Sequence, residues 1–296
     1  MQISLNVFFI LVLLICGSFN IISSLFQISY STGQITQPPL QNGFNSTKLI
    51  ILAFDDSSKT QFNLAKPVLD KYGFKGSFFT VCTFVDNASN GVDLSRMTWN
   101  DIKTLQMQGH DIESHTMTHT DLNHKSPQAL QYEIGGSKQC LLNHGINSTV
   151  FAYPASTGGY NSTVIDVVSK YYNLARVGDA PLAFMHCNGY KKEDDANCLP
   201  FDKNGTLKYE NRYDIRNWSD RPKTEQSSST TNQLPVAFNN GQMFGQFIKG
   251  VNLQSLYNKN GCINAIPIVV YHNFLVDNNH IYLSTDSFTD VNLFEY

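Results

Sequence analysis

The chain has 296 residues, which is long enough for one large domain with a sizeable core and an N-terminal extension. Charged residues make up only 15% of the sequence, and the formal net charge is −3. This composition argues against a nucleic-acid-binding protein and against a protein that binds anionic membranes through basic residues.

The region before Lys48 contains no charged side chain and no histidine. Residues 7–16 form an apolar run with the length of the hydrophobic region of a signal peptide, although no basic residue precedes it. Alternatively, residues 5–22 would remain in place as a membrane anchor. We therefore assign residues 1–24 to a signal peptide or an N-terminal membrane anchor. Residues 25–47 are rich in Ser, Thr, Gln, Asn, Gly and Pro and predict a flexible polar linker.

From Lys48 onward, short apolar runs alternate with stretches of helical pattern. Thr98 and Ser126 are predicted N-caps, and Pro127 suits the first position of its helix. The predicted helices are residues 99–108, 127–143 and 163–172. The predicted strands are residues 49–54, 76–81, 110–114, 150–153, 174–177 and 267–271. Such alternation favours a parallel sheet with crossover helices.

Two parts of the predicted domain, residues 48–296, do not follow this alternation. Residues 187–240 show little periodicity and are predicted to be an insertion within the domain. Near the end, Ser287 or Thr289 would cap a helix that has only one or two turns before the sequence stops. We therefore expect the domain to be truncated at its C-terminus.

Acidic and histidine side chains follow three of the predicted strands. Asp55 and Asp56 end the first strand, and two adjacent carboxylates there resist desolvation unless they have a partner, of which a divalent metal is the simplest. His115 and His119 lie four residues apart after the third strand. One Asp with two His leaves open coordination positions, as a catalytic metal site requires. His272 ends the last predicted strand.

Four segments resemble the motifs of the polysaccharide deacetylases of the NodB-homology type, also called carbohydrate esterase family 4. Residues 53–56 (Ala-Phe-Asp-Asp) resemble the first motif of that family, and residues 114–119 (Ser-His-Thr-Met-Thr-His) resemble the second. Residues 151–154 resemble the third motif in a version without its Arg, and residues 268–272 resemble the fifth. The resemblance extends from about Lys48 to the C-terminus.

The resemblance implies an α/β fold, a distorted (β/α) barrel of about seven parallel strands, with the site at the C-terminal ends of the strands. It implies a divalent metal held by Asp56, His115 and His119, with zinc as the first choice and cobalt, nickel, manganese or iron as alternatives. Asp55 would be the general base, and His272 would be the general acid.

The third and fourth motifs are less complete. The resemblance implies an oxyanion-stabilising N–H at Ala155, beside Tyr153 and Pro154. The Arg that begins the third motif in many relatives, and orients the base, is absent here. No clear fourth motif is present, and residues 212–218 lie in its place, with Asp214 or Arg216 as the predicted partner of the site.

Sequons and cysteines favour export. Asn-x-Ser/Thr sequons occur at Asn45, Asn87, Asn147, Asn161, Asn204 and Asn217. Cys187 and Cys198 flank a polar loop and are predicted to form a disulfide bond, and Cys82 with Cys140 is a second candidate pair. These features predict an extracellular protein, either secreted or anchored to the outer face of the membrane.

The predicted function is metal-dependent hydrolysis of N-acetyl or O-acetyl groups on an extracellular polysaccharide or cell-surface glycan. No nucleic-acid partner is expected. One alternative is a glycan-binding protein on the same scaffold with impaired catalysis. The other is a two-His-one-carboxylate iron oxygenase, which uses the same ligand types but is expected on a jelly roll of many short strands.

Overall fold

The computed structural model describes residues 48–179, 182–184, 212–219, 240–258, 265–277, 280–284 and 289–290. The predicted N-terminal segment, the linker and the predicted Cys187–Cys198 disulfide lie outside the described residues and remain predictions. Among the helices of the described ranges, none combines the length and the apolar character that crossing a bilayer requires.

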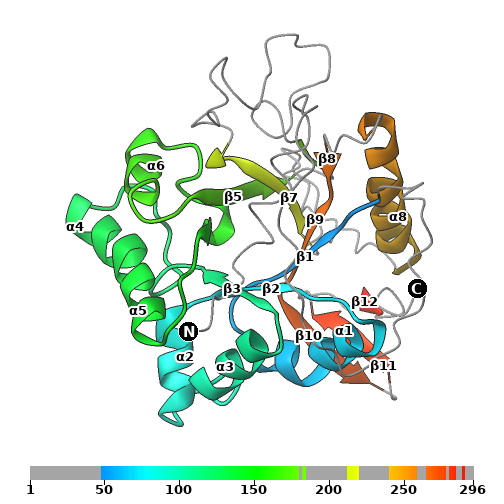
Figure 1. Ribbon diagram of the computed structural model, residues 1–296, viewed down its shortest axis with the longest axis horizontal. Helices are drawn as coiled ribbons and strands as arrows, with labels where there is room; N and C mark the ends of the chain where they lie inside the picture. Colours follow the sequence, from blue (N-terminus) through cyan, green and yellow to red (C-terminus); the bar gives the residue numbers. More distant parts are fainter. Residues whose placement is uncertain are drawn as a thin grey trace, which may run out of the picture.

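Seven parallel strands close into a barrel, which confirms the predicted fold class (Figure 1). Each strand pairs with its neighbours through a parallel ladder, and the ladder between the fifth and sixth strands has a register shift that distorts the barrel. In barrel order the strands are β1 (Ile51–Phe54), β2 (Ser77–Thr80), β3 (Asp111–Ser114), β4 (Val150–Ala152), β5 (Leu174–Asp179), β7 (Ile215–Ser219) and β9 (Ile268–Tyr271).

Five of these strands lie within predicted strands, and β5 extends the predicted strand 174–177 to Asp179. In contrast, β7 lies in the stretch of residues 187–240 that we assigned to an insertion. Part of that stretch is therefore a barrel strand. The segment Ile215–Ser219 has too few apolar residues to predict a strand by itself. Its pairing with β5 and β9 supplies the backbone hydrogen bonds, and its burial depends on those neighbours.

The predicted helices are present on the outside of the barrel (Figure 1). α3 (Trp99–Met107) begins with a capping box, in which Thr98 Oγ1 accepts from the N–H of Asp101 and the Asp101 carboxylate accepts from the N–H of Thr98. The helix after Ser126 runs without interruption through α4 (Pro127–Leu130), the π-helical η3 (Gln131–Gly136) and α5 (Ser137–Asn143). The third predicted helix is α6 (Ser162–Val168).

The sequence patterns missed several further elements. These are η2 (Gln61–Ala65), α1 (Lys66–Tyr72), α2 (Cys82–Ser89), η4 (Pro154–Ser156) and α8 (Asn240–Tyr257). Two short strands, β6 (Ala183–Phe184) and β8 (Ala265–Ile266), pair antiparallel beside the barrel. The N-cap positions of η2 and α2 are Thr60 and Val81, and neither makes a side-chain capping hydrogen bond, so no capping signal marks the start of these helices in the sequence.

After β9 the chain forms a separate antiparallel sheet of β10 (Asn273–Asp277), β11 (His280–Ser284) and β12 (Thr289–Asp290). Thr289 lies in β12 and pairs with Leu283, so it is not the N-cap that the sequence predicted. A helix of one or two turns is unstable by itself, because nucleation costs more than its few hydrogen bonds return. Pairing with β11 satisfies the same backbone groups.

The barrel strands are buried on both faces, as the apolar run before Asp55 predicted. Ala53 points into the barrel and packs in a cluster with Phe79 and Val270. Phe54 points outward, stacks on Phe78 with 4.7 Å between ring centroids, and packs against the surrounding helices. One set of strand side chains therefore fills the barrel interior, while the alternate set packs against the helix layer.

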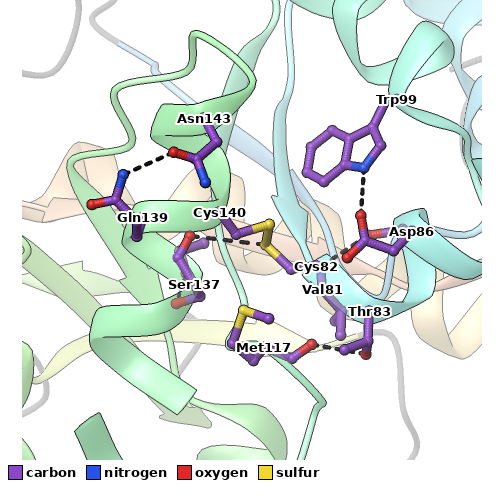
Figure 2. The surroundings of a disulfide bond; sticks show 12 residues. Val81, Cys82, Thr83, Asp86, Trp99, Met117, Ser137, Gln139, Cys140 and Asn143 are labelled. Atoms are coloured by element: carbon purple, nitrogen blue, oxygen red, sulfur yellow. Dashed lines mark hydrogen bonds between the residues drawn. A yellow bond between two sulfur atoms is a disulfide. The ribbon is translucent and has the colours of Figure 1, made fainter. Parts of the chain in front are cut away.

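Cys82 and Cys140 form a disulfide bond that joins the start of α2 to α5 (Figure 2). This pair was the second of the two candidate pairs, and the structure confirms it. The bond closes a loop with a sequence separation of 58, so it restricts the unfolded chain substantially. Cys82 directly follows Val81 at the end of β2, which places the bond close to the rim that carries the site.

Candidate metal and hydrolytic site

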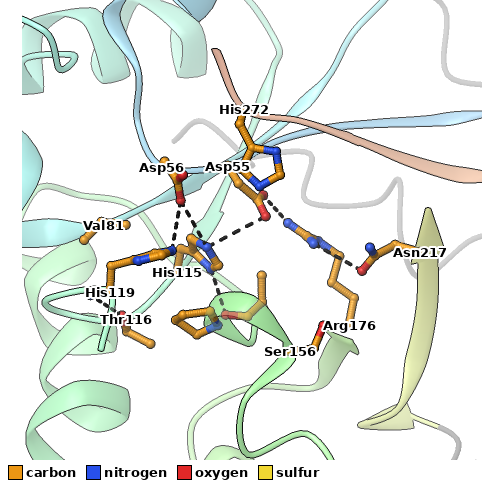
Figure 3. A network of polar contacts seen from close by, with 12 residues as sticks. Asp55, Asp56, Val81, His115, Thr116, His119, Ser156, Arg176, Asn217 and His272 are labelled. Carbon is orange, nitrogen blue, oxygen red and sulfur yellow. Dashed lines mark hydrogen bonds and ion pairs between the residues drawn. The ribbon is translucent and has the colours of Figure 1, made fainter. Parts of the chain in front are cut away.

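The carboxyl ends of β1, β3 and β9 bring the predicted site residues together (Figure 3). Asp55 and Asp56 follow β1 directly and are almost fully buried. His115 follows β3 directly, and His272 follows β9. Parallel strands of a barrel end at the same rim, so residues far apart in the sequence meet there.

Asp56, His115 and His119 form a compact group of potential metal ligands. Asp56 Oδ1 lies 3.4 Å from His115 Nε2 and 3.1 Å from His119 Nε2. One donor atom from each residue lies within 4.8 Å of the other two, and no second group of this kind occurs among the described residues. The set of one carboxylate and two imidazoles fits a divalent transition metal with open coordination positions.

The hydrogen bond of His115 presents the ring for metal binding. Its Nδ1 lies 2.9 Å from the carbonyl oxygen of Ala152. A carbonyl oxygen can only accept, so Nδ1 carries the proton and Nε2 faces the carboxylates. Metal-binding histidines are usually oriented by such a bond from the second ring nitrogen.

The Asp56 carboxylate is held in its ionised form. Burial raises its pKa, but hydrogen bonds donated by His115 and His119 when their rings are protonated lower it, as does the nearby charge of His272, and the net pKa lies well below the usual range for Asp. An ionised carboxylate is the form that binds a metal.

Backbone strain is concentrated in the loops of the site. Left-handed conformations at non-glycine residues are uncommon and persist only where the surrounding structure holds them. Apart from His124, the described non-glycine residues with positive φ all lie in these loops. They are Asp56 (70°), Ser57 (55°), Thr116 (72°), His119 (61°), Ala155 (46°) and Ser156 (62°).

Buried polar contacts hold these loops in place. The Glu133 carboxylate accepts from the N–H of Thr118 at 2.9 Å and from its hydroxyl at 2.6 Å, which fixes the turn between the two histidines. At the start of α2, the N–H of Thr83 donates to the carbonyl of Met117 at 2.9 Å (Figure 2). The metal-ligand loop is therefore anchored on both sides before any metal binds.

Asp55 is paired with Arg176, a residue that the sequence analysis missed. Arg176 Nη2 donates to Asp55 Oδ1, and Arg176 Nη1 donates to Asn217 Oδ1 at 3.3 Å (Figure 3). Its side chain is only 6% exposed. An Arg in the middle of the predicted strand 174–177 was the available clue, because a buried charge needs a partner.

Arg216 directly precedes Asn217 on β7 and is buried. It contacts Tyr160 and Asp214, the latter at 3.2 Å. Burial raises the pKa of Asp214 to about 6, and Arg216 opposes this rise. Alternate residues of a strand point to opposite faces, so Asn217 faces Arg176 while Arg216 faces away from it.

The third-motif residues line the end of β4. Tyr153 and Pro154 are buried, and Tyr153 packs edge-to-face against Phe151 in the hydrophobic core. Ala155 lies in the exposed turn η4 directly beyond β4. The place of Ala155 at the rim is the one that its predicted oxyanion role requires, and that role remains a prediction.

Comparison with known proteins identifies the region that carries this site. Residues 43–173 match the family model described as polysaccharide deacetylase. This region of the chain is thus similar to the polysaccharide deacetylases. It includes Asp55, Asp56, His115 and His119, whereas Arg176 and His272 lie beyond it.

Several known proteins are similar to the same part of the chain. YxkH of Bacillus subtilis, which is named as a polysaccharide deacetylase, is 31% identical over 126 residues, 42% of each chain. A gellan lyase of Bacillus sp is 28% identical over 134 residues, 45% of this chain and 5% of the lyase. The solved Streptococcus pyogenes deacetylase PplD in complex with acetate is 26% identical over 47% of this chain and 60% of its own, with a TM-score of 0.41. The chain thus spans less than half the length of the curated relatives it matches.

Proposed function

We propose that this protein is a metal-dependent hydrolase that removes N-acetyl or O-acetyl groups from an extracellular polysaccharide or cell-surface glycan. The main observation is the meeting of the Asp56, His115 and His119 group with Asp55 and His272 at one barrel rim. The family of residues 43–173 supports an acetylated polysaccharide as the substrate.

The donor set supports a transition metal, with zinc as the first choice. When bound, such an ion supplies Lewis-acid polarisation of a carbonyl group and lowers the pKa of a water molecule towards ~7. Asp56, His115 and His119 would hold it. The preset ring orientation of His115 and the ionised carboxylate of Asp56 favour binding without rearrangement.

The other residues of the rim carry out the proton transfers and stabilise the intermediate. Asp55, oriented by Arg176, takes a proton from the attacking water. The N–H of Ala155 stabilises the oxygen of the tetrahedral intermediate. His272 in its protonated form gives a proton to the departing amine as the C–N bond breaks, so the products are acetate and a free amino group.

The two alternatives predicted from the sequence have less support. A glycan-binding protein with impaired catalysis would be expected to lack a ligand, the base or the acid, yet every one of these residues is at the rim. An iron oxygenase would be expected on a jelly roll, whereas this chain forms a parallel barrel.

We also propose an extracellular location, either secreted or anchored through residues 1–24. The Cys82–Cys140 disulfide is typical of an oxidising compartment. The side chains of Asn87 and Asn147, each in a sequon, are exposed and therefore accessible to a glycosylating enzyme.

The proposed function predicts that the purified protein releases acetate from N-acetylglucosamine oligomers or cell-wall fractions. Acetate release should stop after treatment with a chelator and return when zinc or a similar ion is added, because the site needs its metal. An acetate assay across this panel, with and without chelator, checks the prediction. Full activity in a sample shown by elemental analysis to contain no metal would contradict it.

Loss of the Arg176 side chain should misplace Asp55. We expect Arg176→Met to lower kcat by about 10²-fold, which is the usual effect of a displacement of about 1 Å at a reacting group. Metal content should not change, because Arg176 contacts none of the metal ligands in the recorded bonds. Steady-state kinetics with elemental analysis tests this, and Arg216→Met is the matched control. Equal rates in both variants would exclude a role for Arg176.

A further inference from the structure

The side-chain amide of Gln61 joins the chain segments that follow β1 and β9. Gln61 is the first residue of η2, and its side chain is fully buried. Its Nε2 donates to the backbone carbonyl oxygens of Asp55 and of His272, the latter at 2.6 Å. One amide group is therefore bonded to the residues with the proposed roles of base and acid.

The partners of the amide determine its orientation. Both are carbonyl oxygens, which only accept, so the NH₂ group must face them. The Oε1 atom is then buried without a hydrogen-bond partner among the described residues. A buried acceptor without a partner is destabilising, and such groups in native proteins often have a functional reason.

The hydrogen bonds of Gln61 lie where the ladder between β1 and β9 ends. The N–H of Asp55 donates to the carbonyl of Tyr271 at 2.9 Å, and after His272 the chain leaves the barrel as β10. There the N–H of Phe274 donates to Thr60 Oγ1 at 3.0 Å. We call these contacts of Thr60 and Gln61 the Thr60–Gln61 clamp, and they continue the connection between the two strand ends beyond the ladder.

We propose that the Thr60–Gln61 clamp sets the distance and orientation between Asp55 and His272, so that Gln61 is a positioning residue for the hydrolysis. The inference rests on the proposed function. A base and an acid that act on one bound acetamido group must be held in a fixed relation, and a displacement of about 1 Å lowers the rate by ~10²-fold. Gln61 acts through the backbone of the two residues.

A matched pair of variants tests the clamp. Gln61→Met removes both N–H donors and keeps a similar size. Gln254→Met is the control, because Gln254 is also fully buried and its amide bonds to the N–H (2.7 Å) and the carbonyl (2.9 Å) of Leu49, before the start of β1 and away from the rim. We expect both variants to lower the Tm, and only Gln61→Met to lower kcat, by about 10- to 10²-fold.

KM and bound metal should be unchanged in Gln61→Met, because Gln61 bonds to the backbone of Asp55 and His272 and to none of the three metal ligands. A kcat equal to that of Gln254→Met would overturn the proposal and leave Gln61 with a purely structural role. Thr60→Val keeps the shape of Thr60 and removes only its hydroxyl. If Gln61→Met does not fold, Thr60→Val provides the test instead. An unchanged kcat in Thr60→Val would also overturn the proposal.

Amide hydrogen exchange tests the hydrogen bonds of the clamp independently of the proposed function. The amides of Asp55 and Phe274 should exchange faster in Gln61→Met than in the wild-type protein, with no such change in Gln254→Met. If the wild-type protein releases no acetate from any substrate, the proposed function is wrong and the catalytic role of Gln61 is wrong with it. If exchange at both amides is unchanged, the clamp itself is wrong, whatever the activity.

Discussion

His115→Ala and His119→Ala are expected to abolish stoichiometric metal binding, whereas Asp55→Asn should keep the metal and abolish hydrolysis. Each histidine supplies one of only three protein ligands, and a transition metal held by the remaining two binds weakly. Asp55 is paired with Arg176, and although its Oδ2 lies 3.8 Å from His115 Nε2, it is not one of the three ligands. In Asp55→Asn the amide still accepts from Arg176 but cannot take a proton from water.

Elemental analysis of tag-free protein, together with the acetate assay, measures both halves of this result. His124→Asn is the matched control, since His124 is exposed, lies five positions after His119 and is not part of the ligand group. Asn also tolerates the left-handed backbone of that position. Stoichiometric metal in purified His119→Ala protein would exclude this ligand set. Acetate release by Asp55→Asn at the wild-type rate would exclude Asp55 as the base.

His272→Ala is expected to lower the rate on an N-acetyl substrate by about 10²–10⁴-fold, the usual effect of a lost general acid. Metal content should stay unchanged, because His272 is outside the group of three ligands. The position of His272 directly after β9, on the same rim as Asp55, suits delivery of a proton to the leaving amine (Figure 3).

An activated acetyl ester distinguishes this role from others. Its leaving group departs without a proton, so the defect of His272→Ala should be much smaller on the ester than on the amide. Asp55→Asn is the comparison, because the attacking water must be deprotonated for both substrates and its defect should be similar on both. If His272→Ala loses the same factor on amide and ester, His272 positions substrate or supports the fold, and the acid must be sought elsewhere.

Much of the fold and of the metal group could be predicted from local sequence. Apolar runs such as residues 49–54 form strands buried on both faces, and parallel strands end at one rim of a barrel. Asp56 and His115 lie at strand ends, and His119 belongs to the loop that follows His115. Their meeting therefore depends mainly on strand order and direction, which the alternation of strands and helices predicts. The caps Thr98 and Ser126 were similarly predictable, because a cap bonds to the backbone within three residues.

The partner of Asp55 was decided by tertiary structure. The sequence pointed to residues 212–218, with Asp214 or Arg216 as a partner of the site, and gave no sign that Arg176 of β5 reaches the Asp55 carboxylate. A shift of one residue in strand register reverses which side chains face the barrel interior. The register of β7 is set by its ladders with β5 and β9, which no local pattern contains.

Cysteine pairing and the Thr60–Gln61 clamp were also decided by the tertiary structure. Cys82 and Cys140 are distant in the sequence, and they pair because α2 and α5 pack side by side on the outside of the barrel. Gln61 looks like an ordinary polar residue in the sequence, yet it is buried and bonded to the ends of two strands.

The sequence by itself determined which elements form and which residues end them, because these depend on neighbouring residues. Only the tertiary structure decided which side chains pair across the barrel, because these pairs depend on strand register and helix packing between distant segments.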